Sequence, residues 1–185
     1  MGRLVYQAST SLDGYAADER GNFDFAAPDE EVHRHVNDGE ASIGTYLLGR
    51  RMYETMRVWD DPELFGDGPD YAQDYARIWG RINKVVYSSD PHVSVGPATQ
   101  LEPVFDPEAV KGMKSAARGD LGIGGATLAG QALSAGLVDE IRQYIHPVVI
   151  GGGLSWLPQH LHLDLEPLQM HRFESGVLFL SYKVR

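Results

Sequence analysis

The sequence predicts an α/β fold with three layers, α-β-α. A mainly parallel central sheet carries helices on both faces, and antiparallel strands form its C-terminal edge. Apolar, β-branched runs alternate with helical patterns as far as Ile150, which is typical of parallel βαβ units. After this point the runs 166–172 and 177–184 flank Glu174-Ser-Gly, a hairpin signal that predicts two antiparallel strands. No repeat, linker or low-complexity segment interrupts the chain, so we expect one domain over residues 1–185.

The first predicted strand covers residues 3–10, where Leu4, Tyr6 and Ala8 alternate with other side chains. Asp13-Gly14 is a turn signal, and an irregular segment follows it as far as Pro28. A loop of this length in a compact domain is usually functional or mobile. We therefore expect part of the functional site near Asp13.

Further elements follow from the same patterns. Helices are expected over 29–37, from Gly49 to Met56, over 71–82, over 107–117 and between Gly125 and Gly136, which supplies a C-cap. Strands are expected over 43–48, 83–88, 101–105, 121–124 and 141–150, and a loop over 62–69.

The segment 120–153 reads as a strand, a glycine turn, a helix and a further strand. A helix that begins beside Gly124 and Gly125 offers free backbone N–H groups to a phosphate. A dinucleotide G-x-G-x-x-G fingerprint fails because position 127 is threonine, and a P-loop fails because Gln131 stands where lysine is needed. Phosphate binding and tight strand-to-helix packing both remain open from this segment alone.

Three predicted strands end in small residues: Gly49, the pair Ser88-Ser89, and the pair Gly124-Gly125. Ligands of open α/β sheets bind at the carboxyl ends of the strands. Two of these three ends lead directly into helix N-termini. The arrangement predicts a site for a large, multiply anionic ligand such as a dinucleotide.

Composition narrows the function classes. The formal net charge of −10 argues against nucleic acid or an anionic membrane as a partner. The absence of cysteine excludes disulfides, thiolate nucleophiles and Cys-ligated metals, and no apolar run approaches the roughly 18 residues of a membrane helix. The chain enters a strand pattern at once, unlike a signal peptide. We expect a cytoplasmic protein that binds a small molecule.

The motifs, in this order, resemble the dihydrofolate reductase superfamily. The matching segments are YLLGRRMYETM, NKVVYSS and LGIGGATL. Ser11-Leu-Asp-Gly and His146-Pro-Val-Val-Ile-Gly-Gly-Gly narrow the resemblance to the reductase (C-terminal) domain of bacterial riboflavin-biosynthesis deaminase-reductases. The resemblance covers most of the chain and depends on the five motifs together.

This resemblance implies an enzyme that transfers a hydride from NADPH to a small heterocyclic or carbonyl substrate. It also implies the residues that bind the cofactor, with Ala8 and the stretch to Gly14 near the nicotinamide and the substrate. The remaining implied contacts are Gly49, Arg50, Arg51 and Met52 at the phosphates, Ser88 and Ser89 at the adenosine, and Gly124, Gly125, Ala126, Thr127 and Leu128 at the pyrophosphate. Two alternatives stay open: a nucleotide-binding module without turnover, and a true dihydrofolate reductase. The carboxylate that such a reductase needs on its first helix has only Asp24, Asp29 and Glu30 as candidates, none in a clear motif.

Asp13 and Arg50 each allow two interpretations. Asp13 either positions the substrate or relays a proton, or its carboxylate caps the backbone of an Asp-Gly turn. Arg50 either reads the 2′-phosphate of NADPH or pairs with a surface carboxylate, and Asp90 is the residue that argues against NADPH. His33 and His35 are expected on the solvated surface, because positions i and i+2 of a helix diverge.

Further expectations concern metals, tryptophans, assembly and the glycine turn. No metal site is expected, since His160 and His162 lack an acidic partner. Trp59, Trp79 and Trp156 are expected to serve packing rather than ligand stacking, with Trp156 the exception to watch because it follows the glycine turn 151–153. The apolar C-terminal strands predict a homodimer. The superfamily resemblance implies a cis peptide between Gly124 and Gly125.

Overall fold

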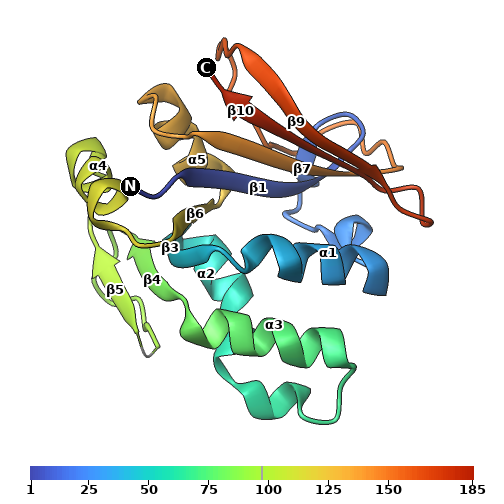
Figure 1. Cartoon of the computed structure of the whole chain (residues 1–185), viewed down its shortest axis with the longest axis horizontal. Coiled ribbons are helices and arrows are strands. Elements are labelled where there is room, and N and C mark those ends of the chain that lie inside the picture. Colours follow the sequence, from blue (N-terminus) through green and yellow to red (C-terminus); the bar gives the residue numbers. More distant parts are fainter. Residues whose placement is uncertain (97) are drawn as a thin grey trace.

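The computed structural model describes residues 1–96 and 98–185. Its centre is an eight-stranded sheet with the order β5-β4-β3-β6-β1-β7-β10-β9 (Figure 1). Its strands are β1 (Leu4–Ser11), β3 (Ile43–Gly49), β4 (Asn83–Tyr87), β5 (Thr99–Glu102), β6 (Asp120–Gly124), β7 (Glu140–His146), β9 (Leu165–Arg172) and β10 (Leu178–Val184). The strands from β5 to β7 pair in parallel, whereas β10 is antiparallel to both β7 and β9. The predicted parallel sheet with an antiparallel C-terminal edge is confirmed.

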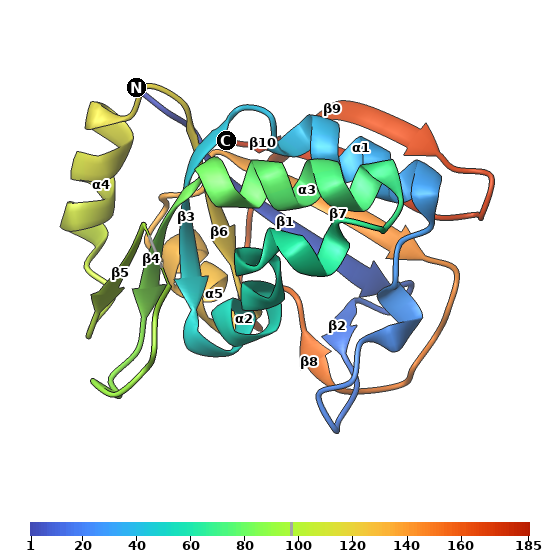
Figure 2. The same ribbon diagram turned by 90° about the horizontal axis from the view of Figure 1, so that it is seen from below.

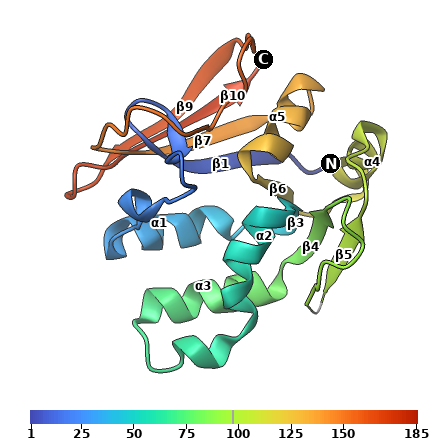
Figure 3. The same ribbon diagram turned by 180° about the vertical axis from the view of Figure 1, so that it is seen from behind.

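Helices cover both faces of this sheet, as the three-layer prediction requires (Figures 1 and 3). The helices are α1 (Glu30–Glu40), α2 (Arg50–Met56), α3 (Asp70–Arg81), α4 (Pro107–Ala116) and α5 (Ala126–Ser134), and the 3₁₀ turns are η1 (Asp24–Ala26), η2 (Arg57–Asp60) and η3 (Pro62–Phe65). Val110 of α4 and Leu133 of α5 pack with Leu4, Leu47 and Ile123 of the strands in the largest buried cluster. On the opposite face, Trp79 of α3 packs with Leu48 and Val86.

Local signals explain most of the boundaries. Asp29 begins α1 by accepting the N–H of Val32 at 2.9 Å, and Asp106 caps α4 ahead of Pro107. The strand predicted over 141–150 ends earlier, at His146, because Pro147 has no N–H to continue the ladder. The strand predicted over 101–105 lies at Thr99–Glu102 instead, and the loop predicted over 62–69 contains η3.

A second, two-stranded sheet was not predicted. In it β2 (Tyr15–Ala17) pairs with β8 (Leu154–Ser155), so the long loop after β1 is joined to the segment after β7 (Figure 2). Trp156 follows β8, stacks on Tyr6 with ring centroids 5.7 Å apart, and accepts the Tyr6 hydroxyl at its carbonyl. The packing role expected of the tryptophans is confirmed for Trp156 and for Trp79, which is 1% exposed.

The prediction that His33 and His35 lie on a solvated surface is wrong. The two side chains do diverge, but each one is half-buried against a different neighbour. His33 Nδ1 lies 3.1 Å from Asn37 Oδ1 and its ring packs on Tyr71, whereas His35 Nδ1 lies 2.8 Å from the Tyr144 hydroxyl. Burial lowers the pKa of both imidazoles. Helix α1 therefore uses both faces for packing.

Candidate active site

Two glycine turns meet at the carboxyl edge of the sheet. β3 and β6 are parallel neighbours, and Leu48 pairs with Gly124, so both strands end at the same level. A Cβ atom on Gly49 would lie 3.9 Å from the Gly124 carbonyl oxygen, and a Cβ atom on Gly125 would lie 3.7 Å from the Gly49 nitrogen. The N-termini of α2 and α5 consequently lie side by side (Figure 2).

The turn before α5 is shaped for backbone donors. Gly125 has φ = 96°, in the region that favours glycine, and no side chain of the described residues caps the helix. The first helical bond is donated by Ala129 to the Gly125 carbonyl at 2.9 Å, which leaves the N–H groups of residues 126–128 at the open end. The partial positive charge of a helix N-terminus adds to the attraction of these N–H groups for an anion.

The cis peptide expected between Gly124 and Gly125 is not found. No peptide bond within the described residues is cis. The chain makes its sharp change of direction through the positive φ of Gly125, which needs no cis bond. Met52 packs behind the turn, with its Cγ 3.1 Å from the place of a Cβ on Gly124.

Charged and hydroxyl side chains gather beside the glycine turns. Gly49 pairs with Tyr87, so Arg50 and Ser88 follow neighbouring strands at the same level. The Arg50 guanidinium contacts two carboxylates: Nη1 lies 3.4 Å from Asp90 Oδ2, and Nε lies 3.7 Å from Glu54 Oε1. Arg51 and Ser89 are exposed beside them. The sequence prediction that these residues share one edge is consistent with this arrangement.

Asp13 lies beyond the end of β1, where it connects two loops. Its Oδ2 accepts the Gly151 N–H at 2.7 Å, and its Oδ1 accepts the Ile150 N–H at 3.3 Å. A hydrogen bond from Ser11 and the Gly151 N–H hold the pKa of this exposed carboxyl below its ordinary value. The observed contacts are those of a backbone cap between distant loops, and the proton-relay role stays a prediction. Ala8, three residues before the end of β1, is half-buried against the main cluster.

A groove of about 740 Å³ runs along α5 from its N-terminus. Ala126 and Thr127 line one end, and Phe105 and the segment 153–159 form its walls. Sequence reasoning missed that segment. Its signals were the glycine run 151–153 and the apolar Leu154, which precede the unpredicted strand β8.

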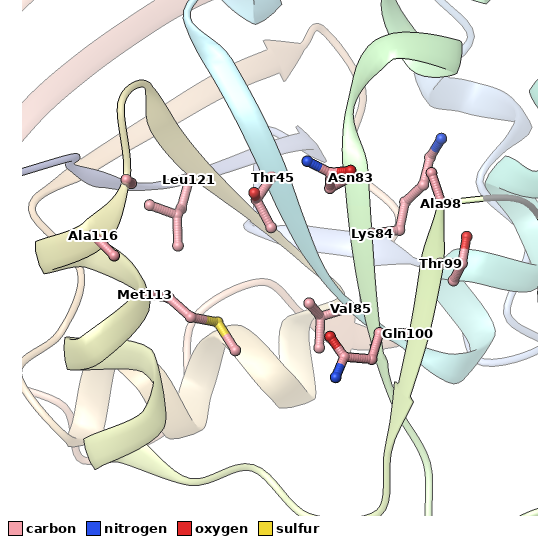
Figure 4. Close-up of a pocket in the computed structure, with 11 residues that line it drawn as sticks. Thr45, Asn83, Lys84, Val85, Ala98, Thr99, Gln100, Met113, Ala116 and Leu121 are labelled. Carbon is pink, nitrogen blue, oxygen red and sulfur yellow. The ribbon is translucent and has the colours of Figure 1, made fainter.

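A second hollow, of about 570 Å³, lies at the other end of the sheet, between α4 and the first residues of β4 and β5 (Figure 4). Thr45, Asn83 and Leu121 line it, and it includes none of the predicted site residues. Among the residues that the structure describes, no group of three or more His, Asp or Glu side chains could hold a metal ion. No helix in the described ranges is long and apolar enough to cross a membrane.

The sheet order and the paired glycine turns define an α/β domain of the dihydrofolate reductase type. The dihydrofolate reductase of Enterococcus faecalis, solved with NADP(H) and RAB-propyl, has a TM-score of 0.65 at 15% identity, covering 100% of this chain and 97% of that one. Acinetobacter baumannii RibD (form 2) has a TM-score of 0.75 at 15% identity and is covered over 58% of its length. A pyrimidine reductase-like protein of Corynebacterium diphtheriae has a TM-score of 0.67 at 16% identity, covering 100% of this chain and 92% of that one.

The chain belongs to the RibD C-terminal domain family, whose model matches residues 3–179. It is also 25% identical, over 181 residues, to the protein YyaP of Bacillus subtilis, which is named as uncharacterized. That alignment covers 97% of this chain and 94% of YyaP. The family resemblance expected from the motifs is confirmed.

Proposed function

We propose that this protein is an NADPH-dependent reductase of a small heterocyclic or carbonyl compound. The observation that carries the proposal is the pair of glycine turns, which brings the uncapped N-terminus of α5 beside that of α2 at the carboxyl edge of a parallel sheet. The donor set fits a dinucleotide, because backbone N–H groups and an arginine suit phosphates. Membership of the RibD C-terminal domain family and the NADP(H) complex of the Enterococcus reductase support the same cofactor.

The residues at this edge have separate tasks in the proposal. The N–H groups of Ala126, Thr127 and Leu128 would bind the pyrophosphate, and Gly49 and Gly125 would let the backbone approach it. Arg50, Arg51, Ser88 and Ser89 would bind the phosphates and the adenosine. When bound, NADPH supplies a hydride.

The end of β1 would hold the substrate. Asp13 would contribute by fixing the loop after β1 to residues 150–151, so that both loops form one wall. The pyrimidine reductase-like and RibD relatives favour a pyrimidinone-type ring as the acceptor of the hydride. A cytoplasmic location stays a prediction.

The primary experiment measures binding and turnover separately. NADPH and NADH are titrated by fluorescence, and NADPH oxidation is followed at saturating cofactor with a panel of pterins, pyrimidinones and small carbonyl compounds. Binding with turnover on at least one member is expected. Failure of both nucleotides to bind would overturn the proposal, and binding without turnover on the panel would favour a non-catalytic module.

Arg50→Ala is expected to weaken NADPH binding by about 1.5–3 kcal/mol and NADH binding much less, because a charge-assisted contact to the 2′-phosphate is lost. The matched control is Arg77→Ala, which removes an exposed, ion-paired arginine from α3. Equal losses for the two cofactors would show that Arg50 does not read the 2′-phosphate.

A homodimer through the C-terminal edge is also expected. On the edge strand β9, Leu168 is 51% exposed and Met170 is 77% exposed, and among the described strands β10 alone pairs with β9. Exposed apolar edge strands tend to associate. Light scattering at micromolar concentration should give twice the mass of one chain, and Met170→Lys should shift it towards the monomer. A monomeric wild-type mass would contradict the proposal.

A further inference from the structure

Arg50, which favours NADPH, and Asp90, which argues against NADPH, are in contact. Nucleotide sites in parallel α/β sheets use an acidic side chain after a strand to bind a free ribose 2′-hydroxyl, and an arginine to accommodate a 2′-phosphate. Here Asp90 follows β4, Arg50 follows β3, and Asp90 Oδ2 lies 3.4 Å from Arg50 Nη1. The guanidinium that would meet the 2′-phosphate is already paired with a carboxylate.

The position of the Asp90 carboxylate is fixed by its own turn. The Asp90 N–H is donated to Ser88 Oγ at 3.1 Å, and Asp90 Oδ1 accepts the His92 N–H at 2.9 Å. Oδ2 is then the oxygen directed at Arg50. The same turn carries Ser88 and Ser89, so the Asp90 carboxylate lies beside the two hydroxyls that are proposed to bind the adenosine of the cofactor.

We propose that Asp90 is a specificity-determining residue, which sets the margin between NADPH and NADH by holding Arg50 in an ion pair that the 2′-phosphate must displace. This inference rests on the proposed function. With both side chains nearly half exposed, at 43% and 46%, the pair is weak enough to exchange one partner for another. The protein therefore prefers NADPH by a smaller factor than an unpaired Arg50 would give, and it also binds NADH.

Glu54 supplies the second carboxylate that contacts Arg50, and it differs from Asp90 in its position. Glu54 stands one helical turn along α2, and its oxygen lies 3.7 Å from Nε rather than from the Nη1 that Asp90 contacts. It follows Arg50 along the helix and does not belong to the turn after β4. Glu54→Gln therefore distinguishes a general release of Arg50 from the specific effect of Asp90.

The test is a titration of both cofactors against wild-type protein, Asp90→Asn, Glu54→Gln, and Asp90→Asn combined with Arg50→Ala. Asparagine keeps an oxygen for the His92 N–H, so the turn is preserved. NADPH affinity in Asp90→Asn should rise about fivefold or more, because the Asp90 carboxylate no longer competes with the 2′-phosphate for Arg50. NADH affinity should stay unchanged or fall, and in the Arg50→Ala background the gain should be below about twofold, since no guanidinium remains to be released.

The control for the change in net charge is Asp74→Asn, which removes a carboxylate of the same 46% exposure from an ion pair on α3. It should leave the ratio of the two affinities as in the wild type. An unchanged ratio in Asp90→Asn, an equal change in Glu54→Gln, or a full gain without Arg50 would overturn the inference while the proposed function stands. Wild-type protein that binds neither nucleotide would instead overturn the proposed function.

Discussion

Gly125→Ala is expected to weaken NADPH binding by at least about tenfold, which is about 1.4 kcal/mol. The cause is conformational. At φ = 96° a residue with a Cβ is strained by about 1–3 kcal/mol, and rotation of the backbone relieves that strain. The contacts of the added atom are ordinary, since the Met52 Cβ would lie 3.5 Å away. The rotation would turn the first N–H groups of α5 away from the phosphate.

The comparison needs a glycine where alanine is harmless. Gly112 lies within α4, and a Cβ atom there would meet nothing within 4 Å. Gly112→Ala should keep NADPH affinity and gain a few tenths to about 1 kcal/mol of stability from helix propensity. Wild-type NADPH affinity in folded Gly125→Ala protein would show that this turn does not hold the cofactor.

The parts of the fold that follow from local patterns were predictable. Asp29, Pro107 and the alternation of Leu4 and Tyr6 set the elements, and the small residues after β3, β4 and β6 placed the candidate site at one edge of the sheet. These signals depend on residues that are close in sequence, where hydrogen-bond capping and side-chain period act directly.

The features that the sequence did not predict correctly depend on contacts between distant segments. β2 has three residues and β8 two, which is too short for an alternation of apolar and polar side chains to be recognised. The two strands form because the loops after β1 and β7 meet. His33 and His35 become half-buried only when α3 and β7 pack on either side of α1. Asp13 and Arg50 each allowed two roles from sequence, and the partners that they contact in the structure, Gly151 and Asp90, lie 138 and 40 residues away.

Gly122 matches the first glycine of the dinucleotide fingerprint that the sequence does not complete, and its neighbour Tyr46 explains why glycine stands there. A Cβ atom at this position would lie 2.2 Å from Cε1 of Tyr46, on the neighbouring strand β3. The Tyr46 hydroxyl donates to the buried carboxylate of Glu40, whose other oxygen accepts from Gln7 Nε2 at 3.0 Å. Gly122 therefore makes room for an aromatic ring that satisfies a buried acid. Burial raises the pKa of Glu40, as expected for a carboxyl taken out of water.

Gly122→Ala is accordingly expected to destabilise the fold by about 3 kcal/mol or more. Overpacking a buried site costs about 1–3 kcal/mol, and a Tyr46 ring that moves away leaves Glu40 without its hydroxyl donor, which costs about 1–3 kcal/mol further. At this chain length the thermal midpoint should fall by roughly 6–12 °C, since each 1 kcal/mol is worth about 2–4 °C.

Two variants establish that the clash with Tyr46 is the cause. Gly44→Ala is the matched control, a glycine of β3 whose added Cβ would approach the Asp120 carbonyl oxygen only to 4.0 Å, so its midpoint should stay near that of the wild type. In a double-mutant cycle of Gly122→Ala with Tyr46→Val, the combined loss should be smaller than the sum of the single losses, because valine leaves space for the new methyl group. Additive losses, or a midpoint for Gly122→Ala within about 2 °C of the wild type, would show that the Tyr46 ring yields without cost.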